Sequence, residues 1–109
     1  MPIQTVGKFS LTNQGGFVAK IEFQYLDHNG NRQVVGESGA IDLGNTKTVD
    51  PGDYGVPDGS ITWLYVDVVW GENNLAQQAF LYARGNAQTA SFVISGTVLD
   101  NHLGLHSVN

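Results

Sequence analysis

The sequence predicts an all-β fold: a single antiparallel β-sandwich domain, jelly-roll-like, with roughly seven to nine short strands over residues 1–109. Hydrophobic and polar residues alternate with period two in most apolar segments. Clusters of Gly, Asn and Asp separate these segments at short intervals, as turns between strands do. No segment keeps a 3.6-residue period, and 14 glycines in 109 residues disfavour long helices.

The first hairpin is predicted over residues 17–36. Its first strand alternates polar residues with a hydrophobic face made of Phe17, Ala19, Ile21, Phe23 and Tyr25. Asn29-Gly30 is the preferred pair for a two-residue type I′ turn, because both central positions need a positive φ. The segment 33–36 is then expected to return antiparallel to the first strand.

Turn clusters divide the rest of the chain into further short strands. The longest loop signal covers residues 50–59, which hold two prolines, three glycines and three aspartates. The expected strands are 40–43, 46–49, 61–70, 75–83, 90–98 and 103–108.

The segment 61–70 carries the strongest strand pattern and has two dissimilar faces. The even positions form the better core face, with Leu64, Val66, Val68 and Trp70. The odd positions place Trp63 and Tyr65 beside Asp67. Either this odd face is an aromatic outer surface, suited to a subunit interface or a lipid, or the strand is central and covered on both sides.

Charge and composition exclude several classes of partner. The net charge is −5, and the five Lys and Arg residues are scattered, so the basic footprint that nucleic acid requires is missing. The same charge opposes binding to anionic membrane surfaces. No segment is apolar for long enough to be a transmembrane helix, and no signal peptide is visible at the N-terminus. Both the cytoplasm and secretion without a classical signal peptide fit this sequence.

We expect no enzymatic activity, because no catalytic constellation stands out. The chain has no cysteine, and its three histidines do not have the spacing of a zinc site. Asp50, Asp53 and Asp58 could gather around calcium in the loop 50–59, although acidic turns without a metal are commoner. We therefore predict no cofactor and no metal ligand.

A binding site for sugars is the chemistry that the loops favour. Sugars are held by Asp and Asn side chains that bond hydroxyls and by an aromatic ring against the apolar sugar face. The predicted ligand-binding residues are Asp53, Tyr54, Trp70, Asn73, Asn74, Asn101 and His102. The alternative is that Asn, Asp and Gly occur here only as turn formers.

Two segments resemble known families of small β-sandwich proteins. They are residues 55–68, where Pro57-Asp58-Gly59 leads into an aromatic strand, and residues 90–97. Their pattern is similar to lectins of the slime-mould hemagglutinin I type, to nematode PUD proteins and, more distantly, to fungal aegerolysins. The lectin resemblance implies glycan binding by loops at one end of a sandwich, without catalysis. The aegerolysin resemblance implies recognition of membrane lipids, and a negative charge does not oppose neutral sphingolipids.

The leading hypothesis is therefore a carbohydrate-binding, hemagglutinin-like lectin that recognises glycans or glycoproteins. Agglutination requires more than one site per particle, so a homodimer or higher homo-oligomer is expected. The alternative is a lipid- or membrane-surface-binding protein that uses Trp63 and Tyr65. A third hypothesis is a structural or interaction protein without a small ligand, whose aromatic face is a subunit interface.

Overall fold

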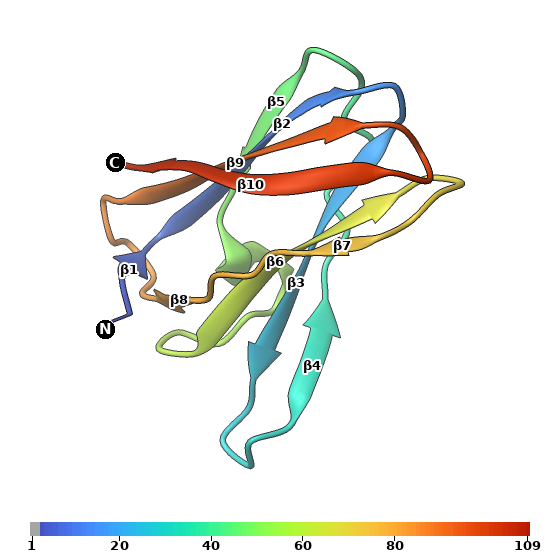
Figure 1. Ribbon diagram of the computed structural model, residues 1–109. Helices are drawn as coiled ribbons and strands as arrows, with labels where there is room; N and C mark the ends of the chain where they lie inside the picture. Colours follow the sequence, from blue (N-terminus) through green and yellow to red (C-terminus); the bar gives the residue numbers. More distant parts are fainter. Residues whose placement is uncertain (1–2) are drawn as a thin grey trace.

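Two β-sheets pack against each other in the computed structural model, which describes residues 3–109 (Figure 1). Sheet A has the order β1 (Thr5–Val6), β8 (Phe80–Tyr82), β6 (Ile61–Val68), β3 (Ala19–Leu26) and β4 (Arg32–Val35), and β7 (Asn74–Leu75) also pairs with β6. Sheet B has the order β10 (Asn101–Val108), β9 (Thr89–Gly96), β2 (Lys8–Gly15) and β5 (Thr46–Val49). The predicted all-β sandwich is confirmed.

The core lies between the two sheets and is rich in aromatic rings. Phe9 of β2 meets Phe23 of β3 with ring centroids 5.3 Å apart and Phe80 of β8 at 5.7 Å, both edge to face. Phe92 of β9 stacks on Phe9 at 6.3 Å. Such edge-to-face and stacked pairs stabilise a core beyond the area that they bury. The contacts of Phe9 with Phe23 and Phe80 join sheet B to sheet A, and the Phe9–Phe92 contact lies within sheet B.

The N-terminal strands β1 and β2 did not emerge from the sequence pattern. The core face of β2 carries Phe9 and Leu11 but then Asn13 and Gly15, so its apolar alternation is interrupted. β2 pairs in parallel with β9, and β1 pairs in parallel with β8, while the remaining pairings are antiparallel. Parallel pairing of distant segments leaves no hairpin signal in the sequence.

The first hairpin forms as expected, but its turn differs from the prediction. Asp27 and Asn31 bracket a three-residue loop, in which the Gly30 amide donates to the Asp27 carbonyl oxygen over 3.0 Å. Gly30 has φ 82°, whereas Asn29 is not among the residues with positive φ. A three-residue loop needs a left-handed residue only at its last position, so the two-residue type I′ turn was wrong.

Two other expected strands are shorter or interrupted. Only Ile41 of segment 40–43 pairs, through a single bridge to Ala19. The segment 75–83 is split into β7 and β8. The loop 50–59 contains a short 3-10 helix, η1 (Pro51–Tyr54), whose first turn is capped by the Asp50 side chain.

β6 confirms the expected core face up to Val68 and departs from it at Trp70. Leu64 and Val66 are fully buried. The strand ends at Val68 because the Gly71 amide donates to the Val68 carbonyl oxygen over 3.1 Å and closes a turn. Trp70 therefore lies in a turn and is exposed, instead of facing the core.

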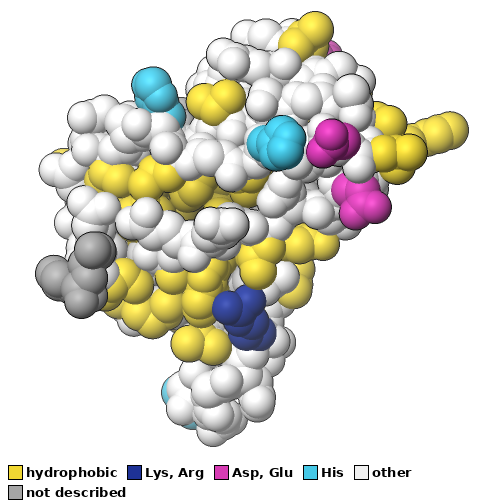
Figure 2. Space-filling view, in the orientation of Figure 1, with side chains coloured by type: hydrophobic (Ala, Val, Ile, Leu, Met, Phe, Trp, Pro, Cys, Tyr) yellow, Lys and Arg dark blue, Asp and Glu magenta, His cyan; other side chains and the backbone are white. Residues whose placement is uncertain are grey.

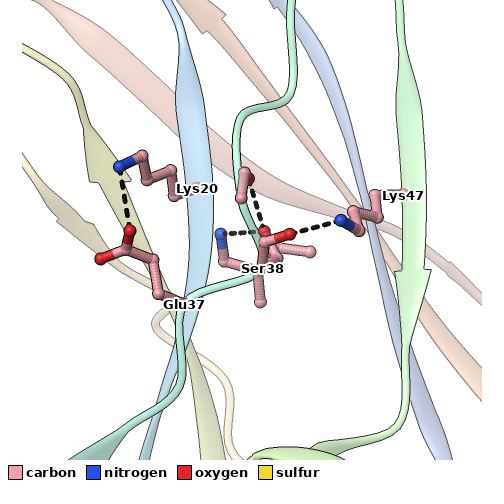
Figure 3. A network of polar contacts seen from close by, with 6 residues as sticks. Lys20, Glu37, Ser38 and Lys47 are labelled. Carbon is pink, nitrogen blue, oxygen red and sulfur yellow. Dashed lines mark hydrogen bonds and ion pairs between the residues drawn. The ribbon is translucent and has the colours of Figure 1, made fainter.

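The segment 36–45 crosses from β4 in sheet A to β5 in sheet B and is fixed by polar contacts (Figure 3). The Ser38 hydroxyl accepts a hydrogen bond from the Ile21 amide over 2.9 Å, and the Lys47 ammonium group donates to the Ser38 carbonyl oxygen. Lys20 and Glu37 form an ion pair at 2.9 Å beside them, which raises the pKa of the Lys20 ammonium group. The Ser38 hydroxyl is thus buried and engaged in holding this crossing.

Candidate functional site

Four turns gather at one end of the sandwich, and we call this set the tip: residues 15–18, 42–45, 69–73 and 97–100. Strand register establishes the gathering. Gly15 at the end of β2 pairs with Gly96 at the end of β9. Ala19 at the start of β3 pairs with Val68 at the end of β6. The Gly44 amide donates to the Asn13 carbonyl oxygen over 2.6 Å, which brings the fourth turn to the same end.

Hydrogen bonds join neighbouring turns of the tip to one another. The Val69 amide donates to the Val18 carbonyl oxygen over 2.9 Å, and the Glu72 amide donates to the Val98 carbonyl oxygen over 2.8 Å. The Asn101 side chain adds a further link, because its Nδ2 donates to the Glu72 carbonyl oxygen over 2.8 Å. Bonds between turns restrict their independent motion, so the tip is a defined surface.

Asn13 is a buried polar residue that organises the turns at residues 15–18 and 42–45. Its Nδ2 donates to the carbonyl oxygens of Phe17, over 2.7 Å, and Ile41, over 2.9 Å. Its Oδ1 accepts from the Gly15 amide over 2.9 Å. The side chain is fully buried. Sequence reasoning missed this residue, although an Asn in the middle of an alternating segment is a signal of a buried polar link.

Hydrophobic side chains project from the tip into solvent. Trp70 is 92% exposed, Leu99 is 72% exposed and Leu43 is 63% exposed. Figure 2 shows hydrophobic side chains standing out from the molecule on the side where the hairpins β6–β7 and β9–β10 end. Large apolar groups that gather on a surface in this way mark an interaction site more often than scattered ones do.

The backbone at Trp70 is also unusual. Its φ is 66°, and it is the one non-glycine residue with positive φ among the described residues. The left-handed conformation costs a side-chain-bearing residue about 1–2 kcal/mol. An exposed tryptophan does not recover this cost by packing, so Trp70 is a candidate residue of a functional site.

The charged groups of the tip are acidic. Asp42, Glu72 and Asp100 lie in its turns, which contain no Lys or Arg. Figure 2 shows acidic side chains and a histidine next to the projecting hydrophobic ones. His102, at the start of β10, lies 3.6 Å from the Asp100 carboxylate.

The residues predicted to bind a ligand fall into two groups at opposite ends of the sandwich. Trp70, Asn73, Asn74, Asn101 and His102 lie together in or beside the tip. Asp53 and Tyr54 lie in η1, after β5, at the end remote from the tip.

The asparagines of the first group use their side chains within the protein. Asn73 Oδ1 accepts from the Val68 amide over 3.0 Å, and Asn74 Nδ2 donates to Asn101 Oδ1 over 2.8 Å. In η1, Asp53 forms an ion pair with Arg84 at 3.0 Å, and Tyr54 packs against the Phe23 ring. These contacts shape the turns and leave Trp70 and His102 as the side chains of the first group that are presented outward.

The acidic loop 50–59 does not assemble the calcium site considered from the sequence. Asp50 accepts from the Tyr82 hydroxyl, and burial together with this carboxylate raises the pKa of Tyr82 to about 12. Asp53 faces Arg84, and Asp58 accepts from the Arg84 amide over 2.9 Å. Residues 3–109 contain no group of three or more Asp, Glu or His side chains placed to hold a metal.

Trp63 and Tyr65 lie half-buried on the outer face of sheet A. The Arg32 guanidinium group stands 3.9 Å above the centre of the Trp63 ring, in cation–π contact. The ring is therefore partly covered from within the same chain. In the described part of the chain no helix is long and apolar enough to cross a membrane.

A groove of about 690 Å³ lies at the end opposite the tip. It runs between the β3–β4 hairpin and the turn 57–60, and Tyr25, Asp27, His28, Gln33 and Asp58 contribute its aromatic and polar lining. Hydrogen bonds from Gln33, Asn31 and Asn29 lower the pKa of the Asp27 carboxyl group. Within the described residues, no Lys or Arg lines this groove.

No protein-family model and no curated protein sequence matches this chain. Solved structures with a similar fold include listeriolysin O, at 17% identity and a TM-score of 0.52 over 94% of this chain. The membrane-binding domain of pneumolysin is 14% identical with a TM-score of 0.52, over 93% of this chain and 96% of that domain. Intermedilysin, solved with human CD59, is 16% identical with a TM-score of 0.52 over 94% of this chain. The chain spans 22% of the listeriolysin O chain and 24% of the intermedilysin chain, so the likeness is one of fold over a single part of those proteins.

Proposed function

We propose that this chain is a non-enzymatic module that binds lipid surfaces through the tip. The observation that carries the proposal is the pair of exposed side chains, Trp70 and Leu99, on two turns that hydrogen bonds hold together. An amphipathic tryptophan suits the boundary between lipid headgroups and acyl chains. The shared fold with the membrane-binding domain of pneumolysin supports the same use of a β-sandwich.

The charge of the tip selects the class of lipid. Its turns carry Asp42, Glu72 and Asp100 without a basic residue, and the whole chain has a net charge of −5. Anionic phospholipids would repel this surface. We therefore propose zwitterionic surfaces, such as phosphatidylcholine or sphingomyelin, as the preferred target.

This placement differs from the lipid-facing residues expected from the sequence. Trp63 and Tyr65 lie on the outer face of sheet A, and Arg32 covers part of the Trp63 ring. Trp70 is the more exposed tryptophan and has no such cover. We propose Trp70, and not Trp63, as the inserting aromatic residue.

The two tryptophans allow the proposal to be tested by fluorescence. In Trp63→Phe the sole tryptophan is Trp70, and in Trp70→Phe it is Trp63, so excitation at the red edge of tryptophan absorption reports on one residue at a time. With phosphatidylcholine–sphingomyelin vesicles, Trp63→Phe is expected to show a blue-shifted emission and to co-sediment with the vesicles. Trp70→Phe, the matched control, should show no shift. A shift confined to Trp63, or no co-sedimentation of the unmodified chain, would contradict the proposal.

Glycan binding is a second candidate, and the groove at the opposite end favours it. Small-molecule sites commonly have volumes of about 300–1,000 Å³, and this groove falls in that range. Its lining combines the Tyr25 ring with the carboxylates of Asp27 and Asp58, which can accept bonds from sugar hydroxyls. A glycan array tests it, with Tyr25→Ala compared with Tyr65→Ala. Binding that is lost only in Tyr25→Ala would place the site here, and a blank array would exclude it.

A further inference from the structure

β10 is an edge strand with an open side. Among residues 3–109 it pairs only with β9 in sheet B, and Figure 1 shows it at the front of the molecule. At its first residue the other side is occupied, because Asn74 Nδ2 of β7 reaches the Asn101 carbonyl oxygen over 3.4 Å, so the open part of the edge starts at Leu103. Asp100 and Thr97 exchange both backbone hydrogen bonds, so the antiparallel alternation directs the amides of His102 and Gly104 toward β9. The backbone groups of Leu103 and Leu105 then point to the open side.

Little in β10 prevents another strand from pairing there. Proteins protect edges with Lys, Pro, inward charges, β-bulges or short strands. β10 is 8 residues long and contains none of those residue types, although one bulge occurs between Leu105 and Ser107. β5, the other edge strand of sheet B, and β4, an edge strand of sheet A, are shorter, at 4 residues each. β5 carries Lys47 and β4 carries Arg32. Figure 2 shows hydrophobic side chains exposed in bands across this face of the molecule.

The sequence of β10 is symmetric about Gly104: His102, Leu103, Gly104, Leu105, His106. An antiparallel pair of two such strands, centred on Gly104, sets Leu103 opposite the partner's Leu105 and ends before the bulge at His106. This pairing occurs twice, as a two-fold axis requires. The outward backbone groups of Leu103 and Leu105 would form about four ladder hydrogen bonds across the axis.

We propose that the chain forms a two-fold symmetric dimer by antiparallel pairing of β10 with β10 of a second copy, centred on Gly104. The dimer joins the two four-stranded B sheets into one continuous sheet. It also covers the open side of Leu103 and Leu105, which are only partly buried in the single chain. The occupant of this edge is thus a second copy of the same chain.

Contacts within residues 3–109 give no reason for glycine at position 104. Its φ lies outside the left-handed region, and a Cβ built on it meets no atom within 4 Å. Nothing in one protomer therefore requires glycine. In the dimer, Gly104 faces its own copy as a non-hydrogen-bonded pair, in which the Cα atoms approach to roughly 4.5 Å. Glycine keeps the two-fold axis free of side chains, and a small residue such as cysteine also fits there.

The orientation of the dimer has a consequence for the tip, which rests on the proposed function. Antiparallel pairing places the tip end of one β10 beside the far end of the other. The two tips then point in opposite directions along the joined sheet. Such a dimer bridges two lipid surfaces, where a parallel arrangement would bind one surface twice.

Cross-linking tests the pairing directly, because the chain has no cysteine of its own. In Gly104→Cys the two thiols would face each other at a Cα separation within the range of disulfides, roughly 4.4–6.8 Å. Mild oxidation is expected to convert Gly104→Cys into a covalent dimer. Thr48→Cys, on the exposed opposite edge of sheet B, is the matched control and should stay largely monomeric. Equal cross-linking of the two variants, or an unmodified chain that sediments as a monomer at all concentrations, would overturn the proposal.

Gly104→Arg separates dimer formation from lipid binding. The single chain has room for the side chain, but two arginines at the axis would clash and repel. Gly104→Arg should sediment as a folded monomer, while Thr48→Arg remains a dimer. A Gly104→Arg variant that still dimerises would refute a dimer axis at Gly104.

With phosphatidylcholine–sphingomyelin vesicles, the unmodified chain should raise light scattering by clustering them, and Gly104→Arg should bind without clustering. Binding without clustering by the unmodified dimer would overturn the bridging. If the unmodified chain binds no vesicles at all, the proposed function and the bridging of two surfaces are both refuted. The cross-linking of Gly104→Cys tests the dimer independently of that result.

Discussion

Replacing Trp70 with alanine should weaken binding to zwitterionic vesicles and leave the fold intact. An aromatic side chain of this size offers at most about 250 Å² for burial. Trp70 has 92% of its surface free in the unbound protein. Immersing half of that area, at about 25 cal/mol/Å², stabilises the bound state by roughly 2–3 kcal/mol. Because about 1.4 kcal/mol corresponds to a tenfold change, the expected loss of affinity is roughly 30- to 150-fold.

Vesicle co-sedimentation over a series of lipid concentrations measures this loss. Val34→Ala is a suitable control, because Val34 is 54% exposed but lies in β4, outside the tip. Its affinity should match that of the unmodified chain. Urea unfolding of Trp70→Ala should show no loss of stability, since the side chain packs against little. Equal affinities for Trp70→Ala and the unmodified chain would refute insertion of this residue.

Three further changes test the physical basis of the tip and the core. Trp70→Gly should be more stable than Trp70→Ala by about 1 kcal/mol in urea unfolding, because glycine adopts a positive φ without strain; equal stabilities would argue against strain at this position. Asn13→Leu removes the side-chain donor to the Phe17 carbonyl oxygen and the acceptor of the Gly15 amide, and should cost about 2–4 kcal/mol, also read by urea unfolding; a loss below that range would mean that the turns are held without Asn13. Tyr82→Phe removes the hydrogen bond to Asp50 and should cost about 1–2 kcal/mol at neutral pH. Since burial and the Asp50 carboxylate raise the pKa of Tyr82 from 10.0 to about 12, the folded state favours the neutral phenol. This contribution is complete below pH 10 and should decline as the pH rises from 10 to about 12; denaturant midpoints over that interval should fall more steeply for the unmodified chain than for Tyr82→Phe.

The fold class and most of the strands were predictable from local pattern. In β3 every second residue is apolar, and in β6 the same holds from Leu64 to Val68, so period-two alternation indicated which face of each strand is buried. The pattern failed where the core face holds a polar residue, as in β2 with Asn13, and where a turn breaks a run, as at Trp70. Non-local pairing, such as β2 parallel to β9, leaves no mark on either segment alone.

The candidate site was partly visible in the sequence and was assembled only by the tertiary structure. The sequence by itself determined that Trp70 stands next to a turn cluster and that the chain is acidic. It could not show that Trp70, Leu99 and Leu43 share one end of the sandwich, because their turns are far apart along the chain. Strand register decided that juxtaposition, together with the separation of η1 from the tip. Register depends on side chains from both sheets filling one core, so it is a property of the packed molecule and of no single segment.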